Sequence, residues 1–145
     1  MSIDSPNVPK RSLIETRFVV FLRTVAIACL WFGLEYWGML VGYSLDGLGR
    51  FDLLSLPWRV AASSLAVIFP VAALGLWLAV SWGPVMWALG AGTQMLMYGL
   101  WPEIFGHNPL VIPMHAMIAL VYLLFRTALW LEKRHKAQEI RVDLP

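Results

Sequence analysis

The hydrophobic positions of the chain fall into four long stretches, and the polar residues gather between them and at both ends. The stretches cover residues 19–43, 57–80, 84–101 and 110–130. Each approaches the ~20 apolar residues that a helix needs to cross the hydrocarbon core of a bilayer. Because hydrocarbon cannot hydrogen-bond an unpaired backbone, we expect each stretch to cross as a helix. The pattern therefore predicts an all-α, four-transmembrane-helix antiparallel bundle.

The remaining residues form short polar segments around this bundle. Residues 1–12 are polar and contain two prolines, which is typical of a disordered tail. The bundle is expected over residues 13–131, and residues 132–145 form a charged tail that continues the last helix. Of the 145 residues, 59% are hydrophobic and 14% are charged. This composition predicts a single membrane domain with no room for a soluble catalytic module.

The basic residues indicate how the bundle is oriented. One group lies before or just inside the first stretch and a second group lies at or after the end of the fourth. Basic residues stay on the cytoplasmic side of a membrane, so both termini are expected in the cytoplasm. This predicts a multi-pass protein of the bacterial inner (plasma) membrane, and topology accounts for the basic residues without nucleic acid as a partner. The two groups are Lys10, Arg11, Arg17 and Arg23, and Arg126, Lys133, Arg134, Lys136 and Arg141.

Glu35 is the clearest polar residue inside a stretch. It lies eight residues before Tyr43, hence ~12 Å below the outer end of the first helix. An ionisable group at such a depth costs about 3 kcal/mol on insertion scales. The same helical face carries Gly38 and Gly42, whose spacing lets another backbone approach closely. We therefore expect Glu35 to point toward another helix.

The other stretches place polar residues at a similar depth. Arg59 and Ser63 lie in the first turns of the second stretch, Gln94 lies in the third and His115 in the fourth. Together with Glu35 they predict one polar layer in the outer half of the bilayer. Small residues share these faces and are expected at helix contacts: Ala62, Ala66 and Gly90.

Two interpretations of this layer remain open. The first is a hydrogen-bonded network that fixes helix packing, in which each bond contributes ~0.6 kcal/mol on average. The second is a pocket open to the periplasm that binds a proton, an ion or a small amphiphile. Glu35 and His115 would be its titrating groups.

No pattern typical of a catalyst, a cofactor or a metal site occurs in the sequence. The three histidines, His107, His115 and His135, cannot supply two haem ligands at matching depth on facing helices. They also lack the spacing of a zinc site. The single cysteine, Cys29, excludes an intramolecular disulfide and is expected to be buried. We therefore expect no metal, no cofactor and no enzymatic activity.

Residues 17–36, from Arg-Phe-Val to Leu-Glu-Tyr, together with the overall layout, resemble small four-span bacterial inner-membrane proteins of unknown function. Leu22-Arg23 and Gly33-Leu34 are similar to the first helix of the DoxX-like four-helix membrane proteins. That second resemblance implies a link to quinone or sulfur redox systems. The chain departs from it in the second helix, where residues 61–64 read Ala-Ala-Ser-Ser and the acidic residue of the DoxX pattern is absent.

Three functional hypotheses follow. The leading one is a non-enzymatic accessory or assembly subunit, in contact with the lipid bilayer, that associates with itself or with a larger membrane complex. It predicts that Gly38→Leu or Gly42→Leu disrupts assembly. The first alternative is a small transport or ligand-binding protein that uses the polar layer around Glu35. The second alternative is a redox accessory of the DoxX type.

Overall fold

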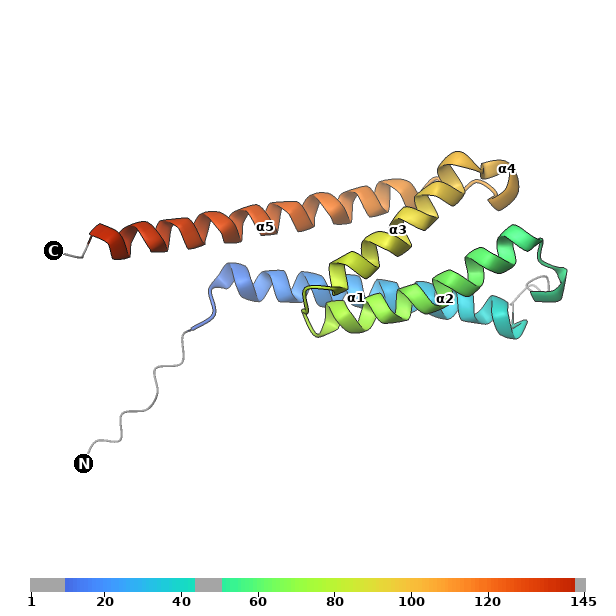
Figure 1. Cartoon of the computed structure of the whole chain (residues 1–145), viewed down its shortest axis with the longest axis horizontal. Coiled ribbons are helices and arrows are strands. Elements are labelled where there is room, and N and C mark those ends of the chain that lie inside the picture. The colour runs from blue at the N-terminus through green and yellow to red at the C-terminus, as the bar shows by residue number, and fades with distance from the viewer. Residues whose placement is uncertain (1–9, 44–50, 143–145) are drawn as a thin grey trace, which may run out of the picture.

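The computed structural model describes residues 10–43 and 51–142, and these are helical with short connections and no strand. The expected N-terminal tail therefore lies almost wholly outside the described residues. Four long helices alternate in direction, and α4 and the 3-10 helix η1 lie in the connections at one end (Figure 1). The elements are α1 (Leu13–Val41), η1 (Phe51–Leu53), α2 (Leu56–Trp77), α3 (Gly83–Leu100), α4 (Pro102–Phe105) and α5 (Val111–Val142).

Local signals in the sequence set both ends of α1. At its start, the Ser12 hydroxyl accepts the Glu15 N–H and the Glu15 carboxylate accepts the Ser12 N–H, which forms a capping box. At its end, Gly42 has φ = 74°, a left-handed conformation that glycine adopts without strain. The N–H of Tyr43 then donates to the Gly38 carbonyl at 2.8 Å. Gly42 thus ends the helix instead of continuing a packing face.

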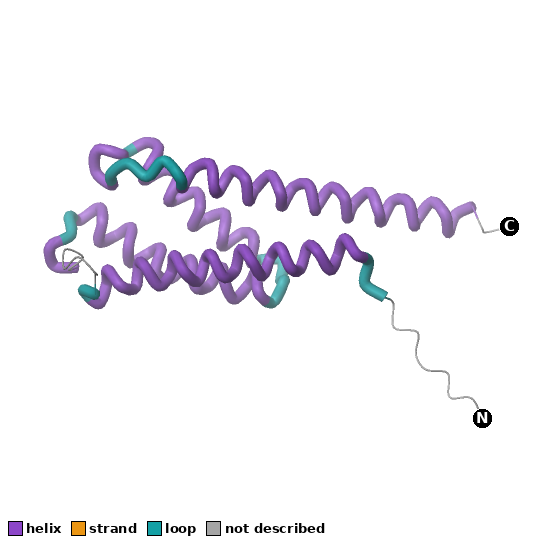
Figure 2. The backbone as a smooth tube through the Cα atoms, turned by 180° about the vertical axis from the view of Figure 1, so that it is seen from behind, coloured by secondary structure: helices purple, strands orange, loops and turns teal. Residues whose placement is uncertain are grey.

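Helices α1 and α2 lie antiparallel and side by side (Figures 1 and 2), and they make the most extensive contact between two helices of the described chain. Gly33 faces Pro70, and a Cβ added to Gly33 would lie 2.8 Å from the Pro70 ring. Only a residue without a side chain allows this approach. Leu65 and Phe69 of α2 are fully buried close to this contact level.

Pro70 lies inside α2 without ending the helix. Because proline has no N–H, the carbonyl four residues earlier, that of Ala66, loses its helical donor. The Trp37 indole of α1 supplies the missing bond, since its Nε1–H donates to the Ala66 oxygen at 2.9 Å. The proline and the tryptophan therefore form one structural unit across two helices.

A tight turn connects α2 to α3. A Cβ added to Gly83 would lie 2.5 Å from the backbone of Gly75, so the first residue of α3 touches the backbone of α2. Ala79, within the turn, has φ = 54°, a conformation that residues other than glycine rarely adopt. The turn holds α3 closely against the end of α2.

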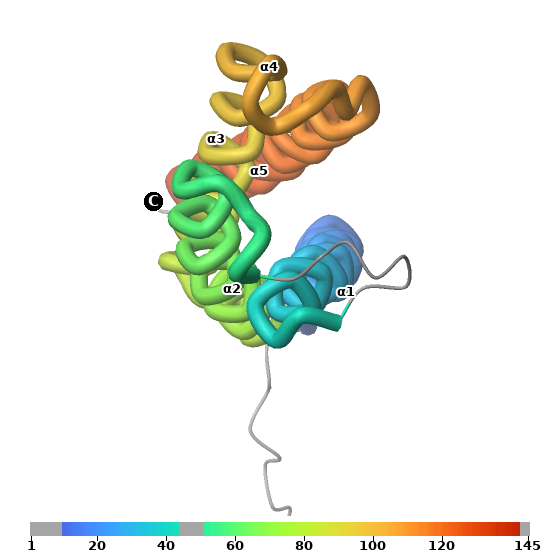
Figure 3. Tube along the Cα trace, turned by 90° about the vertical axis from the view of Figure 1, so that its right-hand side faces the viewer, coloured from blue at the N-terminus to red at the C-terminus, as the bar shows by residue number. Residues whose placement is uncertain are grey.

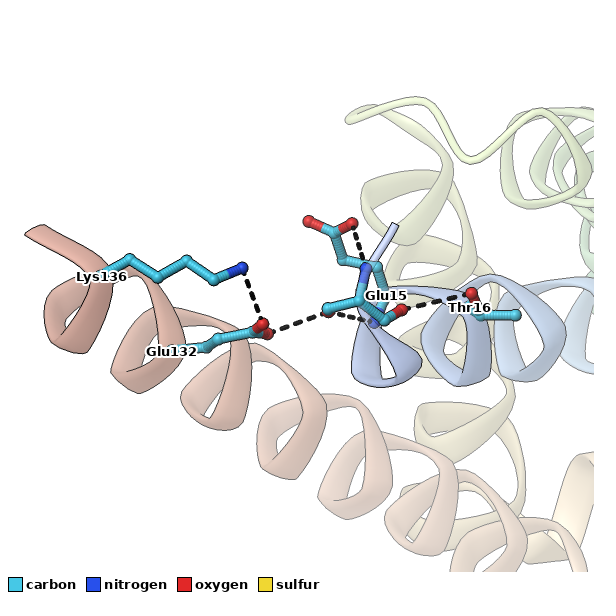
Figure 4. A network of polar contacts seen from close by, with 5 residues as sticks. Glu15, Thr16, Glu132 and Lys136 are labelled. Atoms are coloured by element: carbon cyan, nitrogen blue, oxygen red, sulfur yellow. Dashed lines mark hydrogen bonds and ion pairs between the residues drawn. The ribbon is translucent and has the colours of Figure 1, made fainter. Parts of the chain in front are cut away.

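Helix α5 packs against α3 and α1 on a side away from α2 (Figure 3), and it runs back to the end of the molecule where α1 begins (Figure 1). An aromatic seam joins it to α1: the ring centroids of Phe18 and Tyr122 lie 5.8 Å apart, and those of Phe21 and Phe125 lie 5.5 Å apart. Beyond the seam, the Ser12 hydroxyl donates to the Glu132 carboxylate at 3.0 Å (Figure 4). The start of α1 and the last third of α5 therefore lie at the same end of the molecule.

Three helices of the described chain are long and apolar enough to cross a membrane, namely α1, α2 and α5. The helix over the third expected stretch, α3, is not among them. It has 18 residues and includes Thr93 and Gln94, which lower its apolar character. The expected all-helical class is confirmed, and three of the four expected spans have a helix suited to crossing.

Candidate functional site

Two polar side chains are fully buried in the described residues, and they touch each other. Gln94 of α3 is 2% exposed and His115 of α5 is 1% exposed. The His115 Nε2 atom lies 2.6 Å from the Gln94 Oε1 atom, and the Gln94 Nε2–H donates to the Tyr36 hydroxyl of α1 at 2.9 Å. This hydrogen-bonded chain of three residues links α1, α3 and α5, and we call it the polar core.

Small residues on α3 make room for the polar core. Gly90, one turn before Gln94, faces α2, and a Cβ added to it would lie 3.0 Å from the Phe69 ring. The Phe69 ring in turn stacks on the Tyr36 ring, with centroids 6.1 Å apart and planes 6° from parallel. The approach of α3 to α2 therefore positions both the tyrosine and the glutamine.

Aromatic rings enclose the histidine of the polar core. The centroid of the His115 ring lies 6.2 Å from that of Phe32 and 5.9 Å from that of Trp87. Such surroundings exclude water and strengthen the hydrogen bonds of the enclosed ring. His115 lies only four residues after Val111, the first residue of α5, and both are buried. The first turns of this helix are therefore its most deeply packed part.

The direction of the hydrogen bonds assigns the protons. With the Gln94 amide nitrogen donating to Tyr36, the amide oxygen faces His115 and accepts from its Nε2–H. A neutral His115 then carries its lone pair on Nδ1. In the described structure this buried Nδ1 atom has no hydrogen-bond partner. The polar core thus contains one unused acceptor in an apolar setting.

Glu35 is not part of the polar core, although it precedes Tyr36 in the chain. Successive residues of a helix point about 100° apart, so the inward position of Tyr36 turns Glu35 to the outer face of α1. Its carboxylate is exposed and accepts one hydrogen bond from the Trp31 Nε1–H at 2.9 Å. No helix in the described part of the chain covers it, contrary to the expected contact.

Arg59 and Ser63 also lie apart from the polar core. The Arg59 guanidinium donates to the backbone carbonyls of Asp52 and Leu54, at 2.7 and 2.9 Å, and so fastens the connection before α2. Ser63 is exposed. Of the five residues expected in one layer, the structure brings together only Gln94 and His115.

The residues expected at helix contacts divide in the same way. Ala62, Ala66 and Gly90 are buried between helices. Gly38 is half-buried, and the closest atom to an added Cβ is the Tyr43 carbonyl oxygen of its own helix end, at 3.2 Å. Gly42 is exposed and caps α1. Among the described residues, no other helix lies within 4 Å of a Cβ added at Gly38, so Gly38 does not form the expected contact between helices.

Tyr36, the third member of the polar core, was missed at the sequence level. The sequence contains a signal for it, because a tyrosine inside an apolar helix needs a hydrogen-bond partner for its hydroxyl when it is buried.

In residues 10–43 and 51–142, no group of three or more His, Cys, Asp or Glu side chains could hold a metal ion. The contacts that the polar core does show are the two hydrogen bonds of Gln94.

Comparison with protein-family models gives a match over residues 16–133 to the "Family of unknown function (DUF6163)". The chain belongs to this family. The DUF6163 match includes all three residues of the polar core and most of the four long helices. It is consistent with the expected family of unknown function. Neither the curated proteins nor the solved structures yielded a match.

Proposed function

We propose that this DUF6163 protein is a non-enzymatic subunit of the inner membrane that assembles laterally with a further membrane helix. That helix belongs either to a second copy or to a larger complex. The observation that carries this proposal is the position of Glu35, an exposed carboxylate on the outer face of a helix apolar enough to span a membrane.

The depth of Glu35 makes its exposure unfavourable in a lone chain. It lies six residues before Val41, the last residue of α1, hence ~9 Å below the helix end. A charged side chain facing lipid costs about 3 kcal/mol near the middle of a span and less toward its ends. The Trp31 indole satisfies one carboxylate oxygen, and among the described residues no lysine or arginine pairs with the other. A partner that donates to the second oxygen removes this penalty.

The surroundings of Glu35 suit an approaching helix. Trp31 and Leu34 are well exposed beside it, and Gly38 follows one turn later without a side chain. Large apolar side chains next to a small residue allow close packing of a second helix. We call these four residues the α1 face. The α1 face supports the leading hypothesis of an assembly subunit, and it takes the place of the Gly38/Gly42 pair as the surface for assembly.

The proposed topology has four crossings with both ends in the cytoplasm. Helix α2 ends partway along α1, and α5 starts beside α4, at the opposite end of the molecule (Figure 1). Helix α3 connects the two levels, so in this topology it recrosses the bilayer, although it is not among the three helices that are long and apolar enough to cross. The basic residues at the start of α1 and the end of α5 favour the cytoplasm for that end.

Mass spectrometry of the intact assembly, after extraction of native membranes in mild detergent, tests this proposal. Wild-type protein is expected with a second copy or another membrane subunit. Glu35→Leu is expected to remain folded and inserted but to run as a monomer, because leucine suits a lipid-facing position. The control Glu103→Leu removes an exposed carboxylate of α4 and should leave the assembly intact. A monomeric wild type, or an assembly that survives Glu35→Leu, contradicts the proposal.

The unused Nδ1 acceptor of His115 favours a second candidate, a small-ligand or proton-binding membrane protein. The polar core, and not Glu35, would be its site. A bound small molecule in purified wild type that is lost in His115→Phe supports this candidate. Retained quinone would instead favour the redox accessory, and protein free of any small molecule speaks against both.

A further inference from the structure

A groove runs along the outer side of the α1–α2 pair and has a volume of about 530 Å³. Its floor is made by two small residues, Ala26 and Ala73, which are almost completely covered. Its walls are the exposed side chains of Ile27, Leu30 and Leu74. The groove forms because Ala26 and Ala73 have small side chains, whereas the side chains of Ile27, Leu30 and Leu74 beside them are larger.

The two ends of the groove differ in chemistry. Pro70 lies at one end, beside the close contact with Gly33. Trp77 lies at the other end, and the Arg23 guanidinium carbon is 5.3 Å from the centroid of its ring. Arg23 is exposed, and no carboxylate in the described residues forms an ion pair with it. An apolar groove thus ends at an exposed cation that forms no ion pair with a described carboxylate.

In the proposed membrane insertion, this cation lies at a membrane boundary. Trp77 is the last residue of α2, and the turn into α3 follows directly. The first part of α1 extends past this turn (Figure 1). Tryptophan favours the headgroup level of a bilayer, so Arg23 lies where lipid phosphates lie. The basic residues make this the cytoplasmic boundary in the proposed topology.

We propose that the groove is a binding site for one anionic phospholipid. Its phosphate binds the Arg23 guanidinium, and an acyl chain lies over Ala26 and Ala73 toward Pro70. Stacking on Trp77 holds the guanidinium while its N–H groups remain free for a phosphate. From Arg23 to Leu30 the groove follows seven residues of helix, or ~10 Å, which is long enough for the first part of an acyl chain. The cytoplasmic leaflet supplies anionic headgroups.

This inference rests on the proposed insertion in the membrane but not on the α1 face. A second copy is a poorer occupant of the groove, because it would bury Arg23, and Asp and Glu side chains are absent from the groove lining. The groove and the α1 face meet along α1, yet their lining residues differ. The two proposals can therefore fail independently.

Binding of phosphatidylglycerol to the purified full-length protein tests the site. Lipid retained in mild detergent is counted by native mass spectrometry, with phosphatidylcholine as the zwitterionic reference. Wild type is expected to retain one phosphatidylglycerol in preference to phosphatidylcholine. Arg23→Gln is expected to weaken this binding roughly fivefold, as expected for the loss of one basic contact at a membrane surface. Arg17→Gln, which removes an exposed arginine of α1 away from the groove, should retain wild-type binding.

A second pair of variants tests the groove without changing charge. Leu30→Trp fills the groove from its wall and should reduce retained lipid, whereas Leu120→Trp alters an exposed leucine of α5 and should not. Equal loss in Arg23→Gln and Arg17→Gln, no preference for the anionic lipid, or unchanged binding in Leu30→Trp overturns the proposal. A groove variant that changes the oligomer mass instead identifies a protein occupant and also overturns it. Absence of wild type from the membrane fraction would instead refute the membrane insertion itself.

Discussion

The Trp37 indole hydrogen-bonds to the Ala66 carbonyl at 2.9 Å, and Ala66 is the residue whose carbonyl Pro70 deprives of a helical donor. A side chain of α1 thus repairs the backbone of α2. Ala66 is buried, and a buried carbonyl without a hydrogen-bond donor costs free energy. The bond also fixes the register of α1 against α2, near the contact of Gly33 with Pro70.

Trp37→Phe is therefore expected to lower the free energy of unfolding in detergent micelles by about 1 kcal/mol, within the range found for hydrogen bonds in membrane proteins. Pro70→Ala restores the helical N–H, so Trp37→Phe should cost less in that background. A double-mutant cycle measures this coupling. Equal costs of Trp37→Phe in both backgrounds would show that the indole does not act through this carbonyl.

Within the polar core, substitution of the central residue, Gln94, is expected to lower the free energy of unfolding more than substitution of Tyr36. Gln94→Leu leaves the Nε2–H of His115 buried without an acceptor, which costs about 1–3 kcal/mol. Tyr36→Phe removes the acceptor of the Gln94 Nε2–H but keeps the hydrogen bond between Gln94 and His115, so it is expected to cost less than Gln94→Leu. Equilibrium unfolding in mixed micelles compares the two. A Gln94→Leu protein as stable as wild type would mean that this chain of bonds does not hold the helices together.

Two glycines of the chain should respond in opposite ways to alanine. At Gly75 an added Cβ would lie 2.7 Å from the Gly83 Cα, so the α2–α3 turn must shift. At Gly92 an added Cβ meets nothing within 4 Å, and alanine favours a helix over glycine by up to about 1 kcal/mol. We expect Gly75→Ala to lower the melting temperature and Gly92→Ala to keep or raise it. The opposite order would contradict the close approach of α2 and α3.

The contact between the start of α1 and the end of α5 should depend on pH. Glu132 lies after the apolar stretch 110–130, and hydrogen bonds from Lys136 and Ser12 lower the pKa of its carboxyl (Figure 4). A lowered pKa stabilises the contact fully above the ordinary glutamate value of about 4.3, and this contribution is lost as the pH falls through the lowered pKa. The pKa of Lys136 is raised by the same pair, so its contribution is lost only at strongly alkaline pH.

Amide hydrogen exchange of the first turn of α1, corrected for the intrinsic pH dependence, measures this contact. Protection is expected to be constant near neutral pH and to fall in acid below the ordinary glutamate pKa. Glu132→Gln should abolish that pH dependence, and the control Glu139→Gln, an exposed carboxylate further along α5, should preserve it. A similar acid transition in Glu132→Gln would assign it to another group.

The hydrophobic pattern was sufficient to predict the helices, because length and apolar character alone mark them. The second stretch, expected over 57–80, forms α2 over Leu56–Trp77, and the third, expected over 84–101, forms α3 over Gly83–Leu100. The fourth helix extends to Val142 because its charged residues are good helix formers in an exposed segment. The pattern does not show that α3 is less suited to crossing a membrane than the other helices, because it predicts a polar site from the polar residues of α3.

Depth was predictable from the sequence, whereas the direction of a side chain was not. Gln94 and His115 were expected at one level and do meet. Glu35 and Tyr36 are neighbours in the chain, and only the packing of α1 on α2 and α3 decides which of them points inward. Likewise, the Gly38/Gly42 spacing predicts a packing motif, but Gly42 caps the end of α1 and does not continue a helix face.

The central claim is that a further membrane helix covers the α1 face around Glu35, and photo-cross-linking in intact membranes tests it most directly. Leu34 on this face and Leu120 on α5 are each 59% exposed, so cysteines at the two positions can carry the same cross-linker, in a Cys29→Ala background. We expect Leu34→Cys to give one discrete adduct that disappears when Glu35→Leu is added, and Leu120→Cys to give none. Matching patterns at both positions, or a Leu34→Cys adduct that does not depend on Glu35, would contradict the claim.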